Sequence, residues 1–142
     1  MQLDDLYRRV IMDHYKNPRN RGDIEDGTVT VDLNNPTCGD RISLQLQLAN
    51  GIVQQARFKG EGCSISIASA SMMTDAVKGK TFEDAIALAE KFSSLMKGED
   101  VVFDDYEDLE ALSGVNKFPA RIKCATLAWN ALRKGMEQGG KP

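Results

Sequence analysis

The alternation of apolar and polar residues is strictest from Arg41 to Gly60, in "RISLQLQLANGIVQQARFKG". Apolar side chains occupy every second position up to Asn50-Gly51, a pair whose residues both tolerate positive φ. Apolar positions then resume, so the pattern predicts a β-hairpin with one apolar and one wet face. The preceding "TVTVDL" at 28–33 is expected to add a third antiparallel strand.

The other apolar positions recur at helical spacing. Pro18 ends the first helical segment, Thr81 with Asp84 forms a capping-box-like start, and Pro119 suits an early helical position. A run of small residues after Cys63 predicts a helix whose backbone lies close to the sheet. The expected helices are 3–17, 64–79, 82–98, a short acidic one at 106–112, and 120–138.

These elements predict an α+β fold, a small three-stranded antiparallel sheet with helices packed on one face. The length of 142 residues suits one domain, and the net charge of −3 offers no basic field for nucleic acid. The apolar runs are too short for a membrane span, and the N-terminus lacks a secretory layout. We therefore expect a cytoplasmic protein whose thiols stay reduced.

Three cysteines, in "PTCGD", "EGCSIS" and "ARIKCATLAW", lie at the ends of the expected elements. Cys38 falls in a loop, whereas Cys63 and Cys124 fall at helix starts, where unpaired N–H groups favour a thiolate. Asp40 follows Cys38 across one glycine. Three thiolates and a carboxylate make the four donors of tetrahedral zinc. Sulfur-rich ligands favour zinc or iron–sulfur chemistry over magnesium or calcium.

The alternative for each cysteine taken alone is inert packing, since a free cysteine commonly behaves as a small buried hydrophobe. Flanking glycines in "CGD" and "EGC" leave little side chain to pack against two of them. There is no CxxC pair. The residues by themselves therefore indicate a shared metal or sulfur site and leave its occupant open.

Several motifs, in order, resemble the IscU/SufU family of iron–sulfur cluster assembly proteins. They are "DHYKNPRNRG", "NPTCGD", "GCSIS" with "ASASMM", and "ARIKCATLAW". Lys123 stands where IscU-type scaffolds typically carry a histidine, and the stretch from Cys63 to Cys124 is longer than in those scaffolds. Both departures are similar to the SufU branch. The resemblance implies one IscU/SufU-like domain over 1–142, with a branch-specific insertion at about 93–118.

The resemblance also implies a zinc site made by Cys38, Asp40, Cys63 and Cys124, and a role in sulfur transfer. The expected partner is a PLP-dependent cysteine desulfurase (SufS-type), which would hand over a persulfide sulfur. Downstream cluster scaffold proteins are a second candidate partner, and whether sulfur passes on to them stays open. Cys38 is the expected acceptor because its loop lacks a helix to hold it. Arg121 is a candidate for an assisting role, either holding Asp40 or steering the incoming sulfur, and an exposed arginine at a helix start without a specific role is the alternative. Whether such a zinc-dependent sulfurtransferase is an enzyme stays open, since its partner recycles it.

Three other functions remain at this point. The same ligands suit a scaffold that assembles a [2Fe–2S] cluster, so a transient iron–sulfur cluster is a second expected cofactor. A structural zinc module that binds other proteins would need zinc to fold. A cysteine hydrolase needs a histidine base, and His14, the one histidine, is expected to be a surface or capping residue of the first helix.

Overall fold

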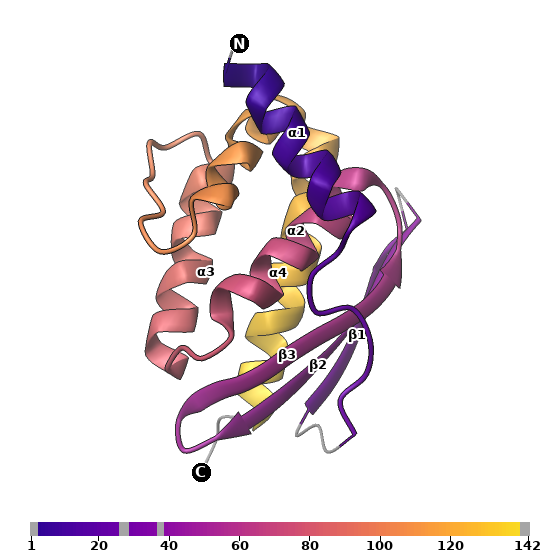
Figure 1. Cartoon of the computed structure of the whole chain (residues 1–142), viewed down its shortest axis with the longest axis vertical. Helices are drawn as coiled ribbons and strands as arrows, with labels where there is room; N and C mark the ends of the chain where they lie inside the picture. The colour runs from indigo at the N-terminus through magenta and orange to yellow at the C-terminus, as the bar shows by residue number, and fades with distance from the viewer. Residues whose placement is uncertain (1–2, 26–28, 37–38, 140–142) are drawn as a thin grey trace.

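The computed structural model describes residues 3–25, 29–36 and 39–139, in which a three-stranded sheet lies against a layer of helices (Figure 1). The predicted α+β fold is confirmed. In chain order the elements are α1 (Leu3–Lys16), β1 (Val29–Asn35), β2 (Asp40–Ala49), β3 (Ile52–Glu61), α2 (Ser64–Val77), α3 (Phe82–Met96), the 3-10 helix η1 (Glu107–Lys117) and α4 (Pro119–Gly139).

The sheet is antiparallel with the strand order β1-β2-β3. Asn50 and Gly51 have φ of 56° and 72°, so the predicted tight turn between β2 and β3 is confirmed. In the register, Leu44 pairs with Val31 on one side and Phe58 on the other. All three side chains are buried. Alternate residues of each strand thus supply the sheet's share of the core.

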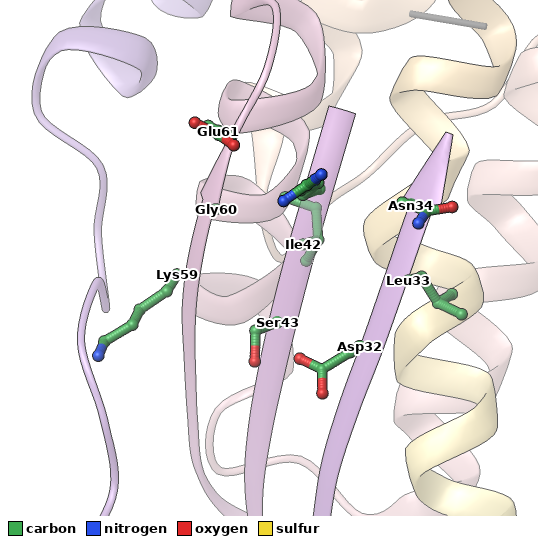
Figure 2. Close-up of a pocket in the computed structure, with 9 residues that line it drawn as sticks. Asp32, Leu33, Asn34, Ile42, Ser43, Lys59, Gly60 and Glu61 are labelled. Atoms are coloured by element: carbon green, nitrogen blue, oxygen red, sulfur yellow. The ribbon is translucent and has the colours of Figure 1, made fainter. Parts of the chain in front are cut away.

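The opposite face of the sheet is polar and carries no covering helix in the described part of the chain. Asp32, Ser43 and Lys59 are register neighbours across the three strands and line a shallow hollow of about 450 Å³ (Figure 2). Lys59 also forms an ion pair with Asp23 at 2.5 Å, which ties the segment after α1 to the edge strand. The predicted wet face is confirmed.

Helix α2 occupies the centre of the helical layer, and small residues let it lie close to its neighbours. The Ser69 hydroxyl donates to the Ala125 carbonyl at 2.6 Å and accepts from the Trp129 indole N–H at 3.1 Å, which joins α2 to α4. Trp129 stacks on Phe92 of α3 with the ring centres 4.7 Å apart. Among the described residues, no helix is long and apolar enough to cross a bilayer.

The segment after α3 differs from the prediction in length and type. A short helix at 106–112 was expected, whereas a 3-10 helix runs over Glu107–Lys117. Apolar positions continue past that expected end, and Leu112 and Val115 are both buried against the helical layer. Burial of these side chains therefore extends the segment beyond the acidic stretch.

The expectation that His14 lies on the surface is wrong. Its side chain is fully buried, with Nδ1 2.7 Å from the Ser71 hydroxyl and Nε2 2.8 Å from an Asp108 carboxylate oxygen. The Ser71 hydroxyl also accepts the backbone N–H of Arg19 at 2.9 Å. This imidazole connects α1 to both α2 and η1. The polar partners come from remote segments, so helical periodicity alone could not reveal them.

Candidate metal centre

Three residues from three elements meet at one end of the sheet. Asp40 is the first residue of β2, Cys63 is the N-cap of α2, and Cys124 lies in the second turn of α4. One ligand atom from each, a carboxylate oxygen and two sulfurs, lies within 4.8 Å of the other two. In the chain, strands β2 and β3 separate Asp40 from Cys63, and helices α2, α3 and η1 separate Cys63 from Cys124. Folding therefore assembles a group that the sequence only suggested.

The Asp40 carboxylate is fully buried. Its Oδ1 accepts the backbone N–H of Cys63 at 3.0 Å, whereas its Oδ2 has no hydrogen-bond partner in the described structure. A buried carboxylate oxygen without a partner is costly, because burial removes its water. A buried carboxylate with an unpartnered oxygen, close to two sulfurs, suits a bound cation.

Cys63 begins α2 in an extended conformation, with φ of −73° and ψ of 167°. Its side chain makes no capping hydrogen bond to the helix, and the residue is partly exposed. The sulfur of Cys63 is therefore placed to act as a ligand instead of a cap.

The Cys124 sulfur is buried inside the turn of α4 that follows Pro119. Its thiol lies 3.7 Å from the Ala120 carbonyl, and the Asn35 side-chain amide donates toward it at 4.0 Å. Asn35 ends β1 and pairs with Asp40 in the sheet register. The helix thus holds this sulfur against the same sheet end that presents the carboxylate.

Arg121 lies one turn before Cys124, and its guanidinium reaches both cysteines. Hydrogen bonding to the Cys124 sulfur, followed by the charge of Cys63, holds the pKa of Arg121 above its usual range. The residue is exposed to solvent. Its positive charge would attract a negatively charged group that approaches the two sulfurs.

Cys38, the fourth expected ligand and the expected sulfur acceptor, lies outside the described residues. Its chain neighbours are described. The Gly39 N–H donates to the Asn35 carbonyl at 2.9 Å, and Asp40 follows Gly39 directly. Asn35 and Gly39, which stand on either side of the segment that contains Cys38, are therefore hydrogen-bonded to each other, and Asp40 follows at once.

The donor set fits a tetrahedral metal ion. In a zinc site with bonds of about 2.0–2.3 Å, neighbouring donor atoms lie roughly 3.3–3.8 Å apart. Side-chain rotations that shorten separations of at most 4.8 Å would bring the three atoms within that range. Sulfur donors together with one carboxylate match zinc chemistry and disfavour magnesium and calcium.

Gly62 and Ser66, which the sequence did not single out for this site, both lie beside the Asp40 carboxylate. A Cβ on Gly62 would lie 2.8 Å from the Ser66 hydroxyl and closer still to Asp40 Oδ1. Gly62 also has a φ of +153°, which other residues rarely adopt. Glycine is thus required here to leave room for the carboxylate. The "EGC" motif hinted at this glycine, but Ser66 resembles the other serines of α2 in sequence.

An apolar groove of about 470 Å³ runs from the site between α1, η1 and the start of α4. Its lining includes Ile65, two residues after Cys63, and Arg121. Phe118, with 62% of its surface exposed, contributes an accessible aromatic ring. Three of the lining residues are cationic and none is acidic: Arg8, Lys117 and Arg121. This excess of positive charge in the groove contrasts with the net charge of −3 of the whole chain.

Residues 6–138 match the family of the NifU-like N-terminal domain. The zinc-dependent sulfurtransferase SufU of Bacillus subtilis is 61% identical, with 97% of this chain and 95% of that protein covered. The iron–sulfur cluster assembly scaffold protein IscU of Streptococcus pyogenes is 49% identical, with coverage of 96% and 86%. A structure assigned as a SUF-system scaffold from Fervidobacterium islandicum superposes with a TM-score of 0.86 at 27% identity, covering 95% and 99%.

Proposed function

Because the chain belongs to the IscU/SufU family of NifU-like N-terminal domains, we propose that it binds zinc and accepts sulfur from a protein persulfide during iron–sulfur cluster assembly. The carrying observation is the buried Asp40 carboxylate, which has one unpartnered oxygen and lies within 4.8 Å of two cysteine sulfurs. The relative named as a zinc-dependent sulfurtransferase supports the choice of zinc over a cluster.

The proposed ligands are Cys38, Asp40, Cys63 and Cys124. Cys38 is the fourth because its neighbour Gly39 is bonded to the end of β1 and Asp40 belongs to the cluster itself. When bound, zinc supplies positive charge that keeps the cysteines deprotonated at neutral pH. No other group of three His, Cys, Asp or Glu side chains with this spacing occurs in the described part of the chain.

Cys38 is the proposed sulfur acceptor. Cys63 is held as the N-cap of α2 and Cys124 is buried in α4, whereas Cys38 belongs to the connection between two strands. Its thiolate attacks the outer sulfur of the donor's persulfide and forms a new S–S bond. The S–S bond of the donor breaks, and the donor cysteine leaves as a thiolate. No external oxidant or reductant is needed, since the exchange conserves electrons.

Arg121 is proposed to attract the incoming persulfide, which is anionic. Its exposed guanidinium already lies against the Cys63 and Cys124 sulfurs. Arg121→Ala should slow sulfur transfer, and Arg121→Lys should retain part of the rate because the charge is kept. Zinc content measured on each variant separates an effect on transfer from loss of the site.

The groove is proposed to receive the segment of a cysteine desulfurase that carries the persulfide. Its apolar floor and its three cations suit a segment with apolar and acidic side chains. Reversing two rim charges, Arg8→Glu with Lys117→Glu, should weaken binding to the desulfurase. Arg57→Glu with Lys134→Glu changes net charge equally at exposed positions outside the groove and is the matched control. Equal affinities of the two double variants would exclude this docking site.

The sulfur-acceptor role is tested by incubating the protein with a cysteine desulfurase and cysteine, followed by intact-mass spectrometry. The wild type should gain sulfur, and Cys38→Ser should not. Cys38→Ser that still gains sulfur would refute Cys38 as acceptor. If the protein contains zinc but neither the wild type nor Cys38→Ser gains sulfur, the result would instead support a structural zinc module.

A scaffold for a [2Fe–2S] cluster is the second candidate, favoured by the 49% identity to a protein named as an IscU scaffold. Lys123, exposed beside Cys124, offers no imidazole ligand there. Anaerobic purification distinguishes the two. A colourless protein with about one zinc per chain supports sulfur transfer, and a brown protein with visible absorbance supports the scaffold.

A further inference from the structure

Two buried side-chain atoms have no hydrogen-bond partner in the described part of the chain, and they lie in the same place. They are Oδ2 of Asp40 and the hydroxyl of Ser66. Both residues are fully buried. Unpartnered buried polar groups are uncommon in folded proteins and call for a physical reason. The unpartnered oxygen of Asp40 is explained by the proposed zinc ion, but the unpartnered hydroxyl of Ser66 is not.

Ser66 faces the carboxylate across the space beside Gly62. A Cβ built on Gly62 would lie 2.8 Å from Ser66 Oγ and within contact of Asp40 Oδ1, so both oxygens border one small gap. The gap stays open because residue 62 has no side chain. Ser66 is in the first turn of α2, three residues after Cys63, whose backbone N–H already donates to the same carboxylate.

The other fully buried serines of α2 have partners. Ser69 bonds the Ala125 carbonyl and the Trp129 indole, and Ser71 bonds His14 and the backbone of Arg19. Those two hydroxyls join helices. An alanine in place of Ser66 would fill nearly the same volume without the cost of burying an unpaired hydroxyl, which is about 1–3 kcal/mol. Packing therefore does not account for a serine at this position.

We propose that Ser66 is a positioning residue for Asp40, an inference that rests on the proposed zinc site. Its hydroxyl donates to the Asp40 carboxylate when that side chain ligates zinc, alongside the Cys63 N–H. Two donors from the start of α2 then hold one side of the carboxylate, and its other oxygen is directed at the metal. Hydrogen bonds of this kind to a ligand typically change metal affinity by about 10–100-fold when they are removed.

The test compares Ser66→Ala with Ser64→Ala, a partly buried serine two residues earlier in the same turn. Zinc affinity is measured by competition with a chromophoric chelator, and the stability of the metal-free protein by urea unfolding. Ser66→Ala should bind zinc about 10-fold or more weakly, with metal-free stability unchanged or increased, because an unpaired hydroxyl has been removed. Ser64→Ala should match the wild type in both measurements.

Cobalt substitution provides a second readout. Ser66→Ala should retain the sulfur-to-cobalt charge-transfer bands, since the cysteine ligands are unchanged, while the ligand-field bands that report the carboxylate shift. A Ser66→Ala variant with wild-type zinc affinity would overturn the inference. So would parallel losses of zinc affinity and metal-free stability, which would mean that the hydroxyl only supports the fold. A wild-type protein that binds no zinc would overturn the proposed function itself.

Discussion

Substitution of Gly62 by alanine tests how closely the backbone is fitted to the Asp40 carboxylate. The new Cβ would lie 2.8 Å from the Ser66 hydroxyl and closer to Asp40 Oδ1, which cannot retreat without losing its bond to the Cys63 N–H. Contacts this short require movement. Since Asp40 starts β2 and its side chain has only two rotatable bonds, the carboxylate itself must shift.

The cost of Gly62→Ala has two parts. Adopting a φ of +153° with a Cβ costs an alanine about 1–2 kcal/mol or more, and overpacking the carboxylate adds about 1–3 kcal/mol. Gly79→Ala is the matched control, because Gly79 has a φ of +86° and no atom within 4 Å of its would-be Cβ. Gly79→Ala should therefore lose only the stability that corresponds to the backbone cost, about 1–2 kcal/mol.

Urea unfolding of the metal-free variants, followed by circular dichroism, measures this difference. Gly62→Ala should be less stable than Gly79→Ala by about 1–3 kcal/mol. A chelator competition on the same samples should show weaker zinc binding for Gly62→Ala alone, because only this variant displaces a proposed ligand. If the two variants unfold at the same urea concentration and bind zinc equally, the reasoning about the crowded carboxylate is refuted.

Three further predictions concern the rest of the molecule. His14→Ala removes the hydrogen bonds to Ser71 and Asp108 and leaves a cavity. It should lower the free energy of unfolding by about 3 kcal/mol and the Tm, measured by calorimetry, by roughly 6–12 °C. An unchanged Tm would contradict the role given to this imidazole. Burial, then the hydrogen bond to Asp75, raises the pKa of Tyr106, so its contribution to the free energy of unfolding is complete below the unfolded pKa near 10 and is lost at higher pH. Tyr106→Phe should therefore flatten the alkaline part of a curve of stability against pH. The same slope in the variant and the wild type would contradict this prediction. Removal of zinc with a chelator should lower stability by about 4 kcal/mol relative to protein in zinc at 1,000 times its Kd, and a Tm independent of zinc would argue against a bound ion.

Much of the fold follows from local patterns in the sequence. The strict alternation around Asn50-Gly51 specified the hairpin and which of its faces is buried, because side chains alternate across a strand and this turn pair accepts positive φ. Thr81 caps α3 through the Asp84 N–H at 3.1 Å, as the capping pattern predicted. Such features depend on residues a few positions apart, so sequence is sufficient for them.

The candidate site was predicted in its residue types and in part of its arrangement. Cysteines at element ends and an acid beside one of them indicated a metal or sulfur site, and the family resemblance supplied the ligand set. The structure brings Asp40, Cys63 and Cys124 within 4.8 Å of one another. Cys38 lies outside the described residues, so its part in the site remains a prediction.

What the sequence determined by itself is the order and type of most elements and the residues able to bind a metal. The tertiary structure alone decided which polar groups are buried and what they meet. His14 shows this, because a helix with one apolar face does not reveal that its imidazole contacts α2 and η1. Ser66 and Gly62 show it beside Asp40, since the unpartnered hydroxyl and the required gap exist only where β2 and the start of α2 converge. Burial and hydrogen bonding depend on segments distant in the chain, and local sequence patterns carry no information on those distances.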